Sequence, residues 1–360
     1  MELLSRMATT RITTALPPNI DITKAELAYG EHMLPKLNRQ LQDDTLITRQ
    51  RALNALCDVL HNPEHVSAAL KVGMAKSLKK LLGDSDGTVR WKATEVLFIC
   101  SNHAIGRDAI LEFDLIQPIS ALFDDQHEDA RLMSHRAVES VSHTVNGAQG
   151  IVDANLIKKL VEKLKTETDE IKQLVLDTLH YCMKVDTSQA LAAEAMEVFT
   201  LLLGHKMWEI RGKAARDIMD ISFPLEGKKK AVKVRCIPVL VKLLADPNFH
   251  VRAQSAGALM SIAITTEGKQ ESIREGAVEA LIALLQADET TDVRLNVIKV
   301  NSLSNVRLLT VKAITMLAEA PSGREKLAQV VPTLQSIANT GGPMMKKVAT
   351  TAIKVITWKP

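Results

Sequence analysis

The chain has 360 residues, of which 46% are hydrophobic and only 3% aromatic, and its formal net charge is +3, from 45 basic and 42 acidic residues. This length exceeds the usual limit of a single hydrophobic core, so the chain forms two domains or one repeat array. Many aliphatic and few aromatic residues favour packed helices over a sheet sandwich. The balanced charge argues against nucleic acid or an anionic membrane as a partner.

The chain begins with a Thr-rich stretch that ends at Pro17-Pro18, which predicts a flexible N-terminal arm over residues 1–18. Residues 19–360 are predicted to form one repeat array, opening with a short element near Ile20–Gly30. No apolar run approaches the ~20 residues that span a bilayer. Glu2, Arg6 and Arg11 interrupt any apolar signal core, so we expect no secretory signal.

A basic residue recurs near the start of each predicted long helix. We call these residues the anchors: Arg49, Arg90, Arg131, Lys172, Arg211, Arg252 and Arg294, with gaps of 41, 41, 41, 39, 41 and 42 residues. Apolar residues follow each anchor by seven and ten positions, on one helix face. They are Leu56, Leu97, Val138, Leu179, Ile218 and Leu259, then Val59, Cys100, Val141, Cys182, Ile221 and Ile262. A small or β-branched residue three after most anchors lets neighbouring helices approach closely.

The turn before each long helix is also periodic. Asp43, Asp84, Asp125, Asp246 and Asp288 each lie six residues before their anchor. Asp accepts hydrogen bonds from free backbone N–H groups, so we interpret these residues as helix caps. The alternative is an ion pair with the anchor of the same or the next repeat.

A helical unit of about 41 residues is the armadillo/HEAT period. A short first helix and a Gly before the second helix, as at Gly73 and Gly276, favour three-helix armadillo units over two-helix HEAT units. The predicted fold is therefore all-α: a right-handed superhelical solenoid of about eight three-helix repeats. The predicted repeats lie near residues 33–73, 74–114, 115–155, 156–195, 196–235, 236–276, 277–329 and 330–360, the last acting as the cap.

The seventh repeat is longer than the others. VRLN at Val293–Asn296 is followed by VRLL at Val306–Leu309, and the apolar stripe resumes from the second copy. Residues 293–305 therefore look like an insertion, expected as an extended helix start or a bulging loop.

Catalytic and cofactor motifs are missing from the sequence, which has no P-loop, Rossmann, zincin or nucleophile-elbow pattern. We therefore expect no enzyme activity, no cofactor, no metal and no small-molecule substrate. His61 and His65 have metal-ligand spacing, but nothing completes a site, so a solvated pair is expected. Lys228–Lys230 is interpreted as a solvated basic turn. The four cysteines are widely spaced and predict buried, reduced thiols in a reducing compartment such as the cytoplasm.

The surface of the third helices is the candidate partner-binding site, because repeat arrays offer extended surfaces. The fifth and ninth residues after each anchor are expected to form an exposed concave ridge. The candidate partner-binding residues on it are Asn54, Asp58, Glu95, Arg136, Ser140, Asp177, Tyr181, Arg216 and Asp220. Armadillo import adaptors and catenins carry an Asn ladder at the ninth position to hold extended peptides, and this chain has none. Mixed charges instead favour docking of a folded or helical partner, the alternative being a merely solvated ridge.

Several segments carry a more specific resemblance: Leu16–Asp44, Thr48–Val66, Gly147–Val152, Pro224–Lys228, Ala313–Leu327 and Ala352–Pro360, the last reading AIKVITWKP. In these segments the chain resembles the radial spoke head 14 homologue family, also called the rhabdoid tumour deletion region protein family. The resemblance covers about Leu16 to the last residue, but neither residues 1–15 nor the insertion.

The resemblance implies a structural subunit of the radial spoke in the axoneme of motile cilia and sperm flagella. Its partners would be other radial spoke subunits and axonemal proteins, and it would lie in the cytoskeleton. The alternative is a soluble armadillo adaptor that transports or assembles ciliary proteins.

Overall fold

The computed structural model describes residues 33–287 and 297–359, and these fold into helices and turns without a strand. The chain divides into two compact units, Met1–Ser134 and His135–Pro360, and the division falls inside helix α9 (Glu128–Ser142). The predicted N-terminal arm and the element near residues 20–30 lie outside the described residues.

The first unit contains consecutive short and long helices. They are α2 (Met33–Gln40), α3 (Leu46–Val59), α4 (Pro63–Lys71), α5 (Met74–Leu81), α6 (Gly87–Ser101), α7 (Ala104–Glu112), α8 (Ile116–Ala121), the 3-10 turn η2 (Leu122–Asp124) and the start of α9.

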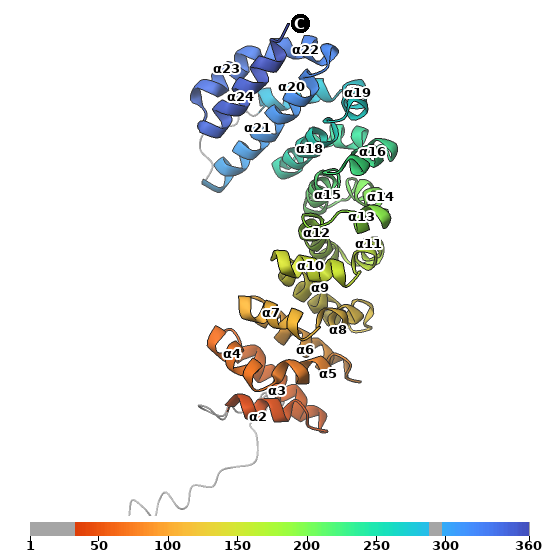
Figure 1. The fold of residues 1–360 in the computed structure, drawn as a ribbon, viewed down its shortest axis with the longest axis vertical. Coiled ribbons are helices and arrows are strands. Elements are labelled where there is room, and N and C mark those ends of the chain that lie inside the picture. Colours follow the sequence, from red (N-terminus) through yellow and green to blue (C-terminus); the bar gives the residue numbers. More distant parts are fainter. Residues whose placement is uncertain (1–32, 288–296, 360) are drawn as a thin grey trace, which may run out of the picture. The chain divides into compact units, whose positions relative to one another are not determined.

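The second unit continues the pattern from α9 to the C-terminus. Its further helices are α10 (Val145–Asp153), α11 (Ile157–Thr166), α12 (Asp169–Met183), α13 (Ser188–Ala192), α14 (Ala195–Leu202), α15 (Trp208–Ile221), α16 (Leu225–Lys233), α17 (Cys236–Leu243), α18 (Phe249–Ile262), α19 (Thr266–Arg274), α20 (Ala277–Ala287), α21 (Val297–Ala318), α22 (Pro321–Leu327), the 3-10 turn η3 (Ala328–Val330), α23 (Val331–Thr340) and α24 (Pro343–Ile356). The long helices α12, α15 and α18 pack side by side in sequence order (Figure 1).

A left-handed residue separates the first and second helices of successive triplets. Among the described residues, those with positive φ are Gly73, Asp114, Asn155, Glu194, Arg235 and Gly276. They recur at nearly the predicted period and lie at, or one residue before, predicted repeat ends. Only two of the six are glycine, although this conformation costs an L-residue roughly 1–2 kcal/mol. The repeat limits themselves stay a prediction.

The apolar stripe of the long helices is buried, as the periodicity predicts. Eleven of its twelve residues are buried, and Val59 is half-buried. Fully burying an aliphatic side chain contributes about 1.5–3 kcal/mol, so this seam is a large part of what holds successive repeats together.

The prediction that the turn aspartates cap the long helices is wrong for the described pairs. The Asp84 carboxylate accepts a bond from the Asp86 backbone N–H in a local turn, and Asp246 does the same with Asn248. The caps lie two residues later, where Asp86 accepts from Val89 N–H and Asn248 from His250 N–H.

The turn aspartates instead bind the anchor of the preceding repeat. Arg90 Nε lies 2.6 Å from Asp125 Oδ2, and Arg211 Nη2 lies 2.8 Å from Asp246 Oδ2. The same anchors donate from Nη1 to the backbone carbonyl six residues before them, Arg90 to Asp84 at 2.8 Å and Arg211 to His205 at 2.9 Å. Arg90 and Arg211 therefore each fix their own turn and tie it to the next repeat, and Arg49 makes the same tie to Asp84. The alternative prediction, an ion pair with the anchor of the same or the next repeat, is right about the kind of contact and wrong about which repeat supplies the anchor.

The first helix of several triplets crosses the preceding long helix at very short range. The third residue of these helices is glycine, at Gly106, Gly147, Gly227, Gly268 and Gly323. A Cβ added at Gly227 would lie 1.8 Å from the Ile221 carbonyl oxygen, and one at Gly147 would lie 1.9 Å from that of Val141. Backbone sits where the side chain would be, so these positions exclude any other residue without a shift of the helix.

Two further expectations fall in the second unit. Helix α21 spans 22 residues and includes residues 297–305 of the predicted insertion, whereas residues 293–296 lie outside the described part.

The Lys228–Lys230 stretch is helical, within α16, and is not the predicted solvated turn. Lys228 is 8% exposed and donates to the Phe223 carbonyl at 2.5 Å, and Lys230 pairs with Glu197.

Candidate functional site

The candidate ridge residues lie on the long helices, but most of their side chains are covered. Asp58 on α3 is exposed, whereas Ser140 on α9 is 6% exposed and the other candidates are half-buried. The expectation of an exposed position is therefore wrong for Ser140, and equally for the equivalent Ser261, which donates to the Ser222 carbonyl at 3.2 Å. Contacts with the end of α15 cover Ser261. A role of these residues in partner binding stays a prediction.

Several charged candidates are already paired within the chain. Glu95 binds Lys92, its neighbour on α6, at 2.7 Å, and Arg136 reaches Glu170 at 2.6 Å. A partner that used these side chains would have to compete with the existing ion pairs.

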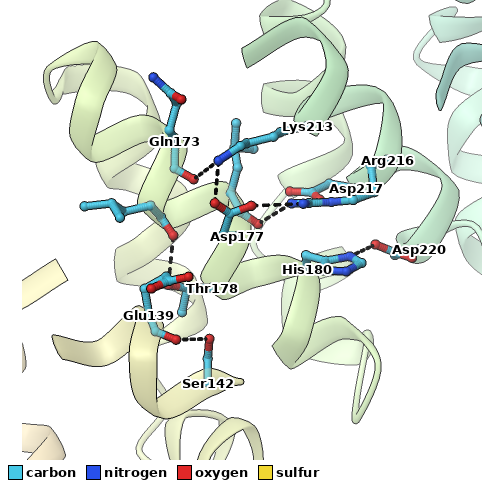
Figure 2. A network of polar contacts seen from close by, with 12 residues as sticks. Glu139, Ser142, Gln173, Asp177, Thr178, His180, Lys213, Arg216, Asp217 and Asp220 are labelled. Atoms are coloured by element: carbon cyan, nitrogen blue, oxygen red, sulfur yellow. Dashed lines mark hydrogen bonds and ion pairs between the residues drawn. The ribbon is translucent and has the colours of Figure 1, made fainter. Parts of the chain in front are cut away.

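The structure brings three of the candidates together in a polar cluster between α12 and α15 (Figure 2). The Asp177 carboxylate on α12 forms ion pairs with two residues of α15, Lys213 and Arg216. Arg216 Nη1 lies 2.9 Å from Asp177 Oδ1. Lys213 also donates to the Gln173 carbonyl at 3.4 Å, and Arg216 Nη2 donates to that of Leu176 at 3.1 Å. These contacts link two consecutive long helices by charge-assisted hydrogen bonds.

The most buried acid of the cluster is Asp217. Its side chain is 0% exposed, and its Oδ1 accepts from Arg216 Nε at 2.9 Å. Its Oδ2 is buried without a hydrogen-bond partner. Burial raises the pKa of Asp217 well above its usual value; the Arg216 charge opposes this rise, and the nearby Asp220 adds to it.

His180 and Asp220 complete the cluster. His180 Nδ1 lies 2.5 Å from Asp220 Oδ2, and both side chains are largely covered. Tyr181, the remaining candidate on α12, packs its ring against His143 and His180, at centroid distances of 4.7 and 5.0 Å, and lies under Lys184. Tyr181 therefore belongs to an aromatic group beside the cluster.

One group in the described residues has the arrangement of possible metal ligands: His180, Asp217 and Asp220, with one ligand atom of each within 4.8 Å of the others. The sequence prediction of no metal site overlooked it. The available signal was Asp217 and Asp220 at helical i, i+3 spacing, with His180 one repeat earlier. His61 and His65, the pair with metal-ligand spacing in the sequence, do not belong to this group. His65 Nδ1 contacts the Val59 carbonyl, and the backbone carbonyl of His61 contacts the His103 ring.

The cysteines are free, and three of the four are buried, which confirms the predicted burial for those three. Burial raises the pKa of Cys100, Cys182 and Cys236 to about 12. At neutral pH these groups are thiols, which are poor nucleophiles and poor metal ligands. In the part of the chain that the structure describes, no helix has the length and hydropathy to cross a membrane.

The comparisons with known proteins agree with this architecture. Residues 195–300 match the family model for HEAT repeats. A crystal structure of an engineered protein superposes with a TM-score of 0.80 at 23% identity, covering 91% of this chain and 79% of that one. The fold is an armadillo/HEAT-type repeat solenoid.

Designed armadillo repeat proteins are also similar to this chain. One superposes with a TM-score of 0.58 at 21% identity, covering 64% of this chain and 99% of that one. Another, in complex with the peptide (KR)4, gives a TM-score of 0.59 at 21% identity, with the same coverage. Such solenoids are typical of non-catalytic scaffolds for protein–protein interaction, and at these identities the likeness establishes the fold alone.

Proposed function

We propose that this chain is a member of the radial spoke head 14 homologue family and a non-catalytic structural subunit of the axonemal radial spoke. It would contribute to the motility of cilia and sperm flagella by docking other spoke subunits. The support is the family-specific sequence in segments such as Ala313–Leu327 and Ala352–Pro360, set on a scaffold fold.

The observation that carries the proposal is the surface where these two segments meet. The Arg324 guanidinium lies 5.1 Å from the centroid of the Trp358 ring, a cation–π contact between them. Trp358 is nevertheless 56% exposed, and Met344 on α24 is 62% exposed. An exposed Trp beside an Arg has the composition of an interface hot spot.

The test is extraction of motile axonemes that carry a tagged copy of the chain. The protein should stay with detergent-stripped axonemes and leave under chaotropic salt. Trp358→Ala should move much of the pool to the detergent-soluble fraction, whereas Lys347→Ala, an exposed change on the same repeat, should not. Recovery of the whole wild-type pool in the detergent-soluble fraction would overturn the proposal.

The second candidate function is a soluble armadillo adaptor in transport or assembly of ciliary proteins. The designed armadillo protein that holds a (KR)4 peptide favours it, because it is an example of peptide binding on this fold. Against it, the chain has no Asn at the ninth position, and Ser140 and Ser261 there are buried. A wholly detergent-soluble pool that co-purifies with cargo would favour the adaptor.

A further inference from the structure

The group His180, Asp217 and Asp220 joins two repeats of the second unit. His180 belongs to α12, and both aspartates belong to α15, three residues apart and therefore on one face. One ligand atom of each lies within 4.8 Å of the others. The side chains of His180 and Asp220 are 16% and 14% exposed, so the group is shielded but reachable from solvent.

The second observation is the Asp217 carboxylate. It is fully buried, and Oδ2 has no hydrogen-bond partner, although Oδ1 is held by Arg216. Buried polar atoms are nearly always paired, and an exception requires a specific cause such as an ion. A carboxylate with one oxygen fixed by a guanidinium and the other unpaired has the arrangement of a monodentate metal ligand.

We propose that His180, Asp217 and Asp220 bind a single divalent transition-metal ion, of which Zn²⁺ is the best fit. One imidazole nitrogen and two carboxylate oxygens suit zinc, whereas Ca²⁺ and Mg²⁺ prefer oxygen ligands alone. At bond lengths of about 2.0–2.2 Å, ligand atoms of a tetrahedral zinc site lie roughly 3.3 Å apart. His180 Nδ1 and Asp220 Oδ2, now 2.5 Å apart, would therefore separate slightly around the ion.

The surrounding charges allow a cation. Burial favours the protonated form of Asp217, and an ion bound there would displace that proton. The carboxylates of Asp177, Asp217 and Asp220 would then face Lys213 and Arg216, which leaves one net negative charge when His180 is neutral. Arg216 bridges Asp177 and Asp217, so it would hold the Asp217 carboxylate in place without touching the ion. The ion would then strengthen an existing tie between α12 and α15, independently of the proposed docking role.

The probe is zinc alone, titrated into the purified full-length chain and followed by calorimetry and thermal melting, with cobalt as a spectroscopic substitute. We expect one ion per chain at roughly 10 µM or tighter, a rise in Tm that chelator reverses, and a cobalt spectrum without thiolate charge transfer.

His180→Ala and Asp220→Asn should each weaken binding at least about tenfold. The matched control is His143→Ala, which removes a more exposed, carboxylate-paired His in the turn directly after α9 and should leave binding unchanged. Asp217→Asn is informative if it folds, and the other two variants decide the matter if it does not. The proposal is overturned if the wild type binds no zinc, or if the His180 and Asp220 variants bind it as tightly as the wild type.

Discussion

Gly227→Ala is expected to destabilise the second unit through a clash between the added Cβ and the backbone at the end of α15. The added Cβ would stand 1.8 Å from the Ile221 oxygen, 2.8 Å from the Ile221 carbonyl carbon and 3.0 Å from Ser222 Cα. Real Cβ atoms essentially never come closer than 3.0 Å to such atoms. Helix α16 must therefore shift by roughly 1 Å, against neighbours already in contact. Overpacking of this kind costs about 1–3 kcal/mol and occasionally more, and we expect the upper end because no flexible side chain can yield.

The assay is urea and thermal unfolding followed by circular dichroism, with hydrogen exchange of the α16 amides as a local readout, because repeat arrays can unfold in parts. A loss of about 3 kcal/mol corresponds to a fall in Tm of roughly 6–12 °C for a unit of this size. The control is Gly204→Ala, whose Cβ would meet only the Leu201 oxygen at 3.6 Å, an ordinary contact. Equal stability of the two variants would refute the reasoning. Helix α4 has His65 at the equivalent position, so its crossing must be wider.

Three further changes test the packing, the ion pairs and the turns. Leu259→Ala should cost about 2–5 kcal/mol by urea unfolding, whereas the exposed Asp58→Ala should stay within about 0.5 kcal/mol; equal losses would invalidate the assignment of the buried stripe. The bond from Arg90 lowers the pKa of Asp125 in the folded state, so this pair stabilises above the ordinary carboxyl pKa and its contribution disappears as pH falls through the lower folded value. Asp125→Asn should therefore flatten the acid side of the curve of stability against pH, and an unchanged curve would contradict the pairing. Glu194→Gly should raise the free energy of unfolding by about 0.5–1 kcal/mol, because glycine accepts φ of 58° without strain; a loss of stability would show that the Glu194 side chain contributes more than its backbone costs.

The sequence predicted the buried seam because apolar residues such as Leu259 and Ile262 recur at helical spacing, and that spacing alone determines one face. It failed at the turn aspartates because their partners are remote. Arg90 and Asp125 are 35 residues apart, one period less the six residues from Asp to anchor. The repeat period is enough to calculate this 35-residue separation, but capping rules consider only residues within one helix turn and cannot predict the pairing.

The site was harder to predict than the fold. Analogy with open grooves places the ninth positions in solvent, but Ser140 and Ser261 are buried. The charge of Asp177 was identified, yet its pairing with Lys213 and Arg216 depends on the rotation of α15 against α12. The sequence of a single helix does not determine how that helix is rotated against its neighbour. The polar cluster could therefore be identified only in the structure.

The ties between repeats also distinguish one junction from another. At most described junctions an anchor Arg meets a turn Asp, but His205 occupies the turn position before Arg211, and it faces Asp169 at 3.2 Å, with Lys206 equally close. The charges at this junction are therefore exchanged: the acidic residue belongs to the earlier repeat and the basic residues to the later one. A repeat duplicated or exchanged from elsewhere in the chain would place Asp against Asp169, and the like charges would repel. The charges at this one junction therefore disfavour any repeat that carries an Asp at the turn position.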